Sequence, residues 1–197
     1  MPGEHAGLSE QWKRRWPGCR PLGDDLKFSA PELFVRFHSL PGGKRYAESV
    51  GEHAEVLARH NTLLGDLVTT FSPANNVELL VITCSWSWDP TPVARAADLV
   101  GVDPFASLWR SDRTDLDDDA WTHSWMSRRP WASGSLDALL ELVAADQTAG
   151  VIISTQSLKW LYHPYDGGGD AMLPTTTARA EFAARHTPWL PDNPMGL

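Results

Sequence analysis

Apolar residues recur at helical spacing over Ser49–Phe71, the longest periodic stretch of the chain. Such spacing predicts a long amphipathic helix that packs one face against a core. Shorter stretches of the same kind predict helices at residues 8–16, 135–147 and 175–186, with Ser135 as the N-cap of the second. The residues expected on the buried face of the long helix are Val50, Ala54, Leu57, Leu64, Val68 and Phe71.

Short apolar or alternating runs between these helices predict β-strands at residues 32–39, 76–88, 121–127, 150–155, 158–162 and 170–173. This order predicts an α+β protein, with a mixed sheet of five to six strands and helices packed mainly on one face. We expect residues 1–197 to form a single domain. Within it, residues 1–31 form an N-terminal helix and loop. Residues 90–120 form an irregular surface excursion, with one small ordered piece around Phe105–Trp109.

The apolar side chains of these elements are expected to meet in one continuous core. If Leu57 is fully packed in that core, its replacement by Ala costs ~2–5 kcal/mol. The core residues predicted from the sequence are Phe34, Val35, Phe37, Leu57, Leu64, Leu79, Val81, Leu139, Val143, Ile152, Ile153 and Phe182.

Tryptophan is unusually frequent, and four of the ten tryptophans alternate with small polar residues in two predicted strands. A period of two places Trp86 and Trp88 on one face of the first strand, and Trp121 and Trp125 on one face of the second. If these strands pair, the rings form one aromatic patch. The patch is either core beneath a helix or an open groove for a sugar ring, base or peptide. We favour core, because large aromatic side chains dominate core energetics.

Charge, apolar content and cysteine content disfavour several classes of protein. The net charge of −8 disfavours nucleic-acid binding, because neutralising phosphates supplies most of that affinity. No apolar run is long enough to span a membrane, and the first residues do not resemble a signal peptide. The two cysteines lie in no metal-binding pattern, and we expect neither a metal nor a cofactor. An abundance of Arg over Lys and of Ala suggests a bacterial genome, and we expect an acidic cytoplasmic protein.

A glycine loop between the first strand and the long helix is a candidate anion site. It contains Gly42, Gly43, Lys44 and Arg45. Backbone N–H groups at the start of a helix favour anions, and the two cationic side chains would strengthen that preference. The loop lacks the fixed spacing of a phosphate-binding motif, and an ordinary turn is the simpler interpretation.

The segment "HPYDGGGD" near the C-terminus predicts a β-hairpin with a glycine turn. We expect residues 166–169 to form the connection, with a positive φ in at least one glycine and Asp166 bonded to local backbone N–H groups. A turn does not account for His163, Tyr165, Asp166 and Asp170 together, and such a cluster is also typical of acid–base chemistry.

The chain resembles a family of bacterial proteins known only as a domain of unknown function. The resemblance lies in Arg36-Phe37-His38 of the first strand, in the hairpin residues Tyr165, Asp166, Gly169 and Asp170, and in Trp189-Leu190 of the tail. It extends from about Glu32 onward. Relatives often carry an acidic residue after Arg-Phe and an arginine in the hairpin, where this chain has His38 and Gly167-Gly168. The resemblance implies the fold and the order of elements, and no reaction.

Two classes of function fit the sequence. The first, which we favour, is a non-catalytic domain that binds another protein, in the manner of toxin-neutralising immunity proteins; no complete catalytic motif is present. The second is a hydrolase or transferase with its site between the segment Arg36–Arg45 and the hairpin His163–Asp170. The candidate catalytic residues are Arg36, His38, His163, Tyr165, Asp166 and Asp170. Proximity of Arg36 or His38 to the hairpin cluster in an open pocket would favour the enzyme.

Overall fold

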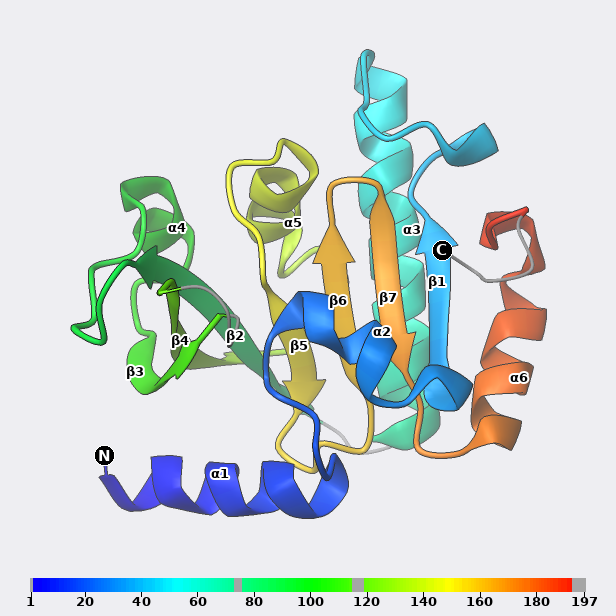
Figure 1. The fold of residues 1–197 in the computed structure, drawn as a ribbon. Coiled ribbons are helices and arrows are strands. Elements are labelled where there is room, and N and C mark those ends of the chain that lie inside the picture. Colours follow the sequence, from blue (N-terminus) through cyan, green and yellow to red (C-terminus); the bar gives the residue numbers. More distant parts are fainter. Residues whose placement is uncertain (1, 73–75, 115–118, 193–197) are drawn as a thin grey trace.

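Seven strands join in one sheet with the order β1-β7-β6-β5-β2-β4-β3 (Figure 1). The computed structural model describes residues 2–72, 76–114 and 119–192. The strands, in chain order, are β1 (Phe34–His38), β2 (Glu78–Ser87), β3 (Ser107–Arg113), β4 (Trp121–Pro130), β5 (Ile152–Thr155), β6 (Leu161–Tyr165) and β7 (Gly168–Met172).

Every neighbouring pair in this sheet is antiparallel, so the prediction of a mixed sheet of five to six strands is correct only in its α+β class. The long helix crosses from β1 to β2, and these two strands run in the same direction. They do not pair, because β7, β6 and β5 lie between them. A sheet with this topology can therefore contain a strand–helix–strand unit without any parallel ladder.

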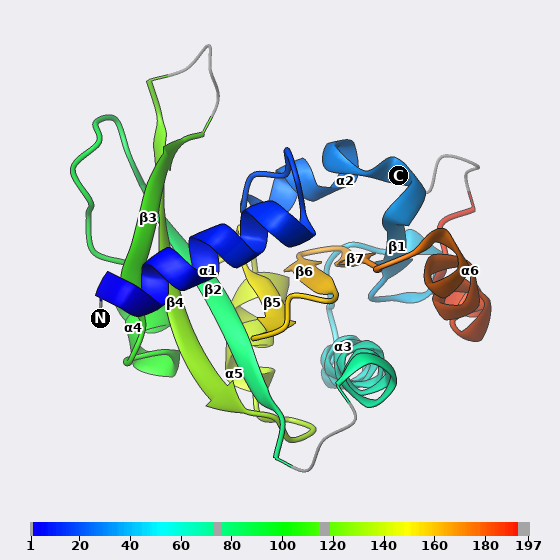
Figure 2. The same cartoon turned by 90° about the horizontal axis from the view of Figure 1, so that it is seen from below.

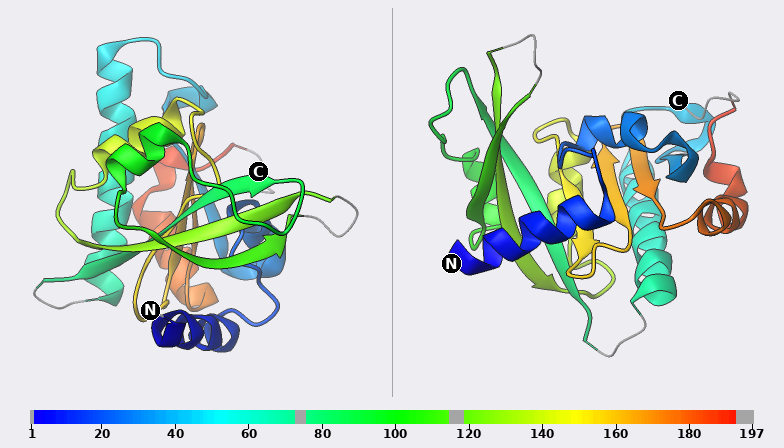
Figure 3. Two further views of the ribbon diagram at one scale, coloured as in Figure 1. Left: turned by 90° about the vertical axis from the view of Figure 1, so that its left-hand side faces the viewer. Right: turned by 60° about the horizontal axis from the view of Figure 1, so that its bottom comes forward.

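Helices cover both faces of the sheet. The helices are α1 (Pro2–Arg15), α2 (Leu26–Ser29), α3 (Val50–Phe71), α4 (Ala97–Val102), α5 (Asp137–Ala144) and α6 (Thr176–Arg185). Figure 2 shows α2 and α3 on opposite sides of the strands β6, β7 and β1. The face of the sheet that carries α3, α4, α5 and α6 is the more heavily covered. The helices α1 and α2 lie on the opposite face (Figure 3).

The helix α3 forms where the apolar periodicity predicts it, but its buried face is rotated from the predicted one. Val50 is 87% exposed and Leu57 is only partly buried. The first turns of α3 extend beyond the ends of the strands (Figure 1), so they have no sheet to pack against. Leu57→Ala is accordingly expected to cost less than a fully buried leucine would. The buried residues of α3 are Val56, Arg59, His60, Leu63, Leu64, Leu67 and Val68.

The N-caps of α3 and α5 differ, and only the one of α5 was predicted from the sequence. Ser49 caps α3, because its hydroxyl accepts a hydrogen bond from the backbone N–H of Glu52 at 3.2 Å. Ser135 does not cap α5, which follows Leu136 as its N-cap. The Ser135 hydroxyl instead accepts a hydrogen bond from the backbone N–H of Ala132 and closes a turn before the helix.

The sheet separates two hydrophobic cores, because successive residues of a strand point to opposite sides. On β1, Val35 and Phe37 enter the core beneath α3, whereas Phe34 enters the core beneath α1. On β5, Ile153 enters the core beneath α3 and Ile152 enters the core beneath α1. The expectation of one continuous core is therefore wrong, although Phe34, Val35, Phe37, Ile152 and Ile153 are all buried.

Residues 90–120 are more ordered than the sequence indicates, since this stretch contains both α4 and β3. The strand β3 lies at the sheet edge and pairs with β4, with a register shift between Leu108 and Arg110. Only Trp109 is buried in it. The charges of Arg110, Asp112 and Arg113 obscure the alternation on this half-exposed edge strand, so apolar patterning fails to predict it.

The register of β2 and β4 overturns the predicted aromatic patch. Thr83 lies opposite Trp125 and Ser87 lies opposite Trp121, so those tryptophans share a face with small residues of β2. Trp86 and Trp88 are on the other face and are 46% and 76% exposed. The four rings therefore do not form one cluster, and the preference for core is wrong for Trp86 and Trp88.

Candidate functional site

The hairpin of β6 and β7 has a two-residue connection, Asp166-Gly167, because Tyr165 pairs with Gly168. None of the three consecutive glycines has a positive φ, so the prediction of a left-handed glycine turn is wrong. Close contacts with neighbouring strands explain why glycine is needed at positions 168 and 169. A Cβ on Gly168 would lie 1.9 Å from the carbonyl oxygen of Phe37, and one on Gly169 would overlap the ring of a neighbouring tyrosine.

Three polar side chains lie side by side across β1, β7 and β6. The register places Arg36 opposite Asp170, and Asp170 opposite His163. The Nε and Nη2 atoms of Arg36 donate hydrogen bonds to Oδ1 and Oδ2 of Asp170, both at 2.7 Å. This bidentate pair is largely buried, and its hydrogen bond raises the pKa of Arg36. Arg36 therefore stays protonated within the wall of the site.

Tyr165 completes this wall. The guanidinium carbon of Arg36 lies 4.8 Å from the centre of the Tyr165 ring, in cation–π geometry. Burial raises the pKa of Tyr165, and the nearby carboxylate of Asp170 raises it further. The phenol is therefore protonated at neutral pH and acts as a hydrogen-bond donor rather than as a base.

His163 is held in one tautomer by the backbone. Its Nδ1 lies 2.7 Å from the carbonyl oxygen of Val151, and since a carbonyl only accepts, Nδ1 carries the proton. In the neutral ring Nε2 is then an acceptor, 3.8 Å from Oδ1 of Asp24. A protonated His163 would lower the pKa of Asp24, because only the doubly protonated ring has an Nε2–H to donate to that carboxylate. Gly23 permits this approach, because a Cβ there would lie 2.3 Å from the imidazole.

Asp166 has partners outside the hairpin. Its Oδ2 accepts hydrogen bonds from Nε of Arg45 at 2.5 Å and from the hydroxyl of Tyr46 at 2.8 Å. Burial raises the pKa of Asp166, but these two bonds, the charge of Arg45 and the backbone N–H of Gly167 together lower it overall. The expected role of Asp166, bonding to local backbone, is therefore secondary. Its main role is to tie the hairpin tip to the loop before α3.

These groups line one open cavity of about 420 Å3, a size typical of small-molecule sites. We call it the hairpin pocket. All six candidate catalytic residues border it, together with Gly43 and Arg45 of the predicted anion loop. The full lining is Asp24, Lys27, Arg36, His38, Gly43, Arg45, Asp146, Thr148, Ala149, Gly150, His163, Pro164, Tyr165, Asp166, Gly167 and Asp170.

The remainder of the predicted anion loop is turned elsewhere. Gly42 does not line the hairpin pocket, although it and Gly43 have the left-handed φ values of 66° and 69°. The ammonium of Lys44 pairs with Glu48 at 2.9 Å and with Glu52 at 2.8 Å, and Glu52 raises its pKa most. Because α3 starts later and has its own cap, the glycine loop does not present helix N–H groups to an anion.

Several residues of the pocket were missed by the sequence analysis. Asp24 and Lys27 come from the segment before β1, and Asp146, Thr148 and Gly150 come from the segment between α5 and β5. No spacing in the sequence links these segments to the hairpin, because their proximity depends on the strand order. The pair Asp24-Asp25 was a visible polar cluster, but nothing marked it as part of a site.

The chain belongs to the protein family described as a domain of unknown function (DUF3885), which matches residues 22–194. This match includes every residue of the hairpin pocket and leaves out α1. No curated protein and no solved structure matches the chain. The family thus supports the expected resemblance, and the geometry of the pocket is the basis for a proposal about function.

Within residues 2–72, 76–114 and 119–192, no group of three or more His, Cys, Asp or Glu side chains is arranged to hold a metal ion. In the same part of the chain, no helix has the length and apolar character needed to cross a membrane.

Proposed function

We propose that the hairpin pocket binds a small polar molecule with an anionic group, and that the chain is an enzyme of the hydrolase or transferase class. The proposal rests on one observation, the meeting of distant segments of the chain in one cavity. Residues from β1, from the loop before α3 and from the hairpin, far apart in sequence, meet in one cavity around an ion pair. Arg36 contacts the Tyr165 ring there, which is the proximity that favours an enzyme over a purely structural hairpin.

Two cations at the pocket supply the preference for an anion. Arg45 uses only its Nε for Asp166 and is 64% exposed in its side chain, which leaves both Nη groups available to a ligand. Lys27 also lines the pocket, and its charge contributes to lowering the pKa of Asp24. A phosphate or carboxylate could accept hydrogen bonds from both side chains. Asp24 and Asp146 would accept bonds from hydroxyl or amino groups elsewhere on the same ligand.

Proton transfer is the chemistry that the pocket supports best. The Nε2 atom of His163 is an acceptor, and the backbone bond of Nδ1 fixes its direction, as for a general base. Tyr165, kept protonated by burial, supplies a neutral donor close by. Arg36 stacks on the ring of Tyr165, and its bond to Asp170 ties β1 to β7 beside that ring. His163 is therefore the residue assigned to accept a proton.

Phosphate titration tests the anion site. Inorganic phosphate is added at constant ionic strength, with chloride as the replaced anion, and the melting temperature is followed. We expect phosphate to raise the melting temperature of the wild type and of Lys44→Ala, whose charge faces Glu48 and Glu52. Arg45→Ala and Lys27→Ala should lose the rise. An equal rise in all four proteins would indicate salting-out alone and would refute the anion site.

His163→Asn tests the proton acceptor separately. Asn can keep a donor near the carbonyl of Val151 while it removes Nε2. We expect the variant to retain its fold and its phosphate response, and to lose turnover of any substrate identified by screening phosphate and carboxylate esters. A variant that turned over such a substrate at the wild-type rate would exclude His163 as the base.

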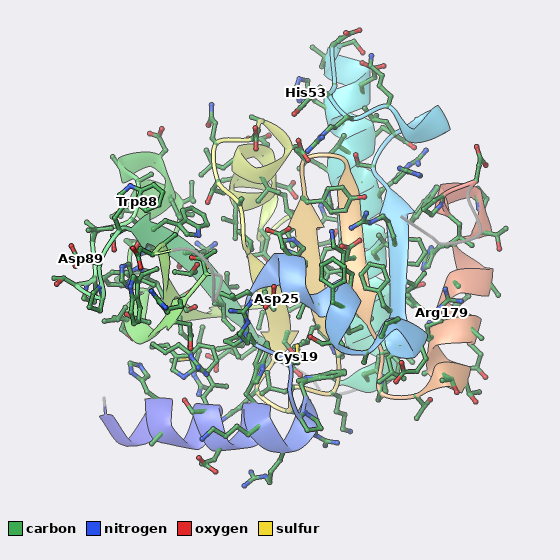
Figure 4. All side chains as sticks on the ribbon, in the orientation of Figure 1. Cys19, Asp25, His53, Trp88, Asp89 and Arg179 are labelled. Carbon is green, nitrogen blue, oxygen red and sulfur yellow. The ribbon has the colours of Figure 1, made fainter. Side chains whose placement is uncertain are left out.

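Capture of another protein is the second candidate, and exposed aromatic side chains favour it. Trp88 is 76% exposed and Phe105 is 89% exposed. Figure 4 shows Trp88 beside Asp89 near α4, away from the hairpin of β6 and β7. Large exposed aromatics are enriched at protein interfaces. A pull-down from the native cell with wild type and Trp88→Ser, Phe105→Ser would test this candidate: loss of a specific partner in the double variant supports it, and unchanged recovery opposes it.

A further inference from the structure

We infer that the ligand of the hairpin pocket carries a planar heteroaromatic ring, which stacks on Trp86 while the anionic group binds near Arg45. This inference rests on the proposed function and names the class of ligand. Trp86 lies near the end of β2 and is 46% exposed, which is unusual for so large an apolar side chain.

Trp86 and the polar row of the hairpin pocket are on the same face of the sheet. On β2, Leu80 and Ile82 enter the core beneath α1, and Trp86 follows them at a period of two. On β1, Arg36 follows Phe34 of that same core in the same way. The ring and the ion pair therefore face the same side of the molecule, the side over which α1 and α2 lie.

Gly150 joins the two regions. A Cβ built on Gly150 would lie 3.4 Å from Cζ2 of Trp86 and 3.3 Å from Sγ of Cys84, so the indole abuts this glycine. Gly150 also lines the hairpin pocket. Its φ of 68° favours glycine, and the missing side chain keeps the junction between ring and pocket open.

A smaller cavity of about 70 Å3 lies along Trp86 and adjoins the hairpin pocket at Asp24 and Gly150. Its wall combines the indole and Cys84 with the polar side chains of Thr114 and Thr122. An apolar face beside hydroxyl groups suits a flat ring that has hydrogen-bonding atoms on its edge. The two hydroxyl groups hydrogen-bond each other at 2.8 Å, and the pair keeps one donor hydrogen and acceptor lone pairs for the edge of a ring.

The site therefore has two parts, an aromatic platform and a cationic rim, separated by the junction at Asp24 and Gly150. A molecule that spans both parts needs a ring at one end and an anion at the other. Nucleoside monophosphates have this chemistry, and they serve as the probes. Stacking of one ring on an indole is expected to strengthen binding by about tenfold.

The experiment compares four nucleoside 5′-monophosphates (adenosine, guanosine, cytidine and uridine) with ribose 5-phosphate, which lacks the ring. Dissociation constants are measured by calorimetry at fixed ionic strength. We expect at least one nucleotide to bind the wild type about tenfold more tightly than ribose 5-phosphate. Trp86→Leu should remove that advantage, and Trp86→Phe should restore most of it. Trp88→Leu is the matched control, because Trp88 is more exposed and lines neither cavity.

The outcomes separate the two proposals. If ribose 5-phosphate binds in an Arg45-dependent manner but no nucleotide binds more tightly, the ring platform is refuted and the anion site stands. Equal losses in Trp86→Leu and Trp88→Leu would also refute the platform, since a general loss of aromatic surface would then explain them. If neither phosphate nor ribose 5-phosphate shows Arg45-dependent binding, the proposed function itself fails. Circular dichroism of each variant checks that the fold is retained.

Discussion

Gly168 is predicted to be the least replaceable of the three hairpin glycines. A Cβ on Gly168 would lie 1.9 Å from the carbonyl oxygen of Phe37, although real Cβ contacts are essentially never shorter than 3.0 Å. The clash involves the backbone of β1, so no side-chain rotation relieves it. β1 and β7 would have to separate by about 1 Å at the pair formed by His38 and Gly168.

The expected cost follows from two contributions. Forcing an extra methyl into a packed contact costs ~1–3 kcal/mol. Stretching the ladder beside it leaves a buried backbone group poorly paired, which costs ~1–3 kcal/mol more. We therefore expect Gly168→Ala to lower the free energy of unfolding by roughly 2–6 kcal/mol, a large fraction of the ~5–15 kcal/mol of a typical domain.

Gly167→Ala is the matched control. Its nearest neighbour would be Cε2 of Tyr165 at 3.0 Å, a side-chain atom that can shift. Gly167 has no positive φ, so alanine is not strained there, and a smaller unfolded-state entropy offsets part of any cost. We expect a change below about 1 kcal/mol. Urea unfolding followed by tryptophan fluorescence measures both variants. Equal losses in Gly167→Ala and Gly168→Ala would refute the argument from close approach.

Two further predictions concern buried charge. Asp170→Asn should lower the free energy of unfolding by ~3–5 kcal/mol, because it leaves Arg36 as a buried cation with an uncharged partner; a urea midpoint within error of wild type would contradict this. His60 is fully buried, and burial lowers its pKa from 6.5 to about 4. Above pH 6.5 the ring is neutral in both folded and unfolded states. As the pH falls from 6.5 towards 4, only the unfolded chain gains this proton, and stability should fall by up to roughly 3 kcal/mol. In His60→Gln the loss over this pH window should be smaller by that amount, and an unchanged pH profile would exclude His60 as its source.

Local sequence patterns predicted most of the elements but not their arrangement. The periodicity of Ser49–Phe71 located α3 almost to the residue, because the spacing of its apolar side chains is a local property. Its buried face depends on where the sheet ends, and the sequence does not contain that information in any local form. The edge strand β3 was missed for a related reason, since half-exposed positions tolerate charges that hide the alternation.

The glycines of the hairpin illustrate the same limit. A run of glycines beside an aspartate is typical of a left-handed turn, and that local rule predicted a positive φ. Glycine is needed at positions 168 and 169 for another reason: a side chain at Gly168 would collide with the backbone of β1, and one at Gly169 would collide with a ring of β6. Lys44 is a similar case. The sequence analysis assigned it to the anion loop, but in the structure its ammonium pairs with Glu48 and Glu52.

The candidate site was partly predictable because its residue types are chemically distinctive, even though their meeting depends on strand order. Burying Arg36 and Asp170 together costs desolvation, and well-packed apolar side chains would often be as stable at such positions. Stability alone is therefore a weak reason for this pair. It lies in the wall of an open cavity, Arg36 stacks on a protonated tyrosine, and Asp170 lies opposite a histidine whose Nδ1 is bonded to the backbone. An ion pair in that setting fixes the positions of reactive side chains, and this use of buried charge supports the assignment of the hairpin pocket as the functional site.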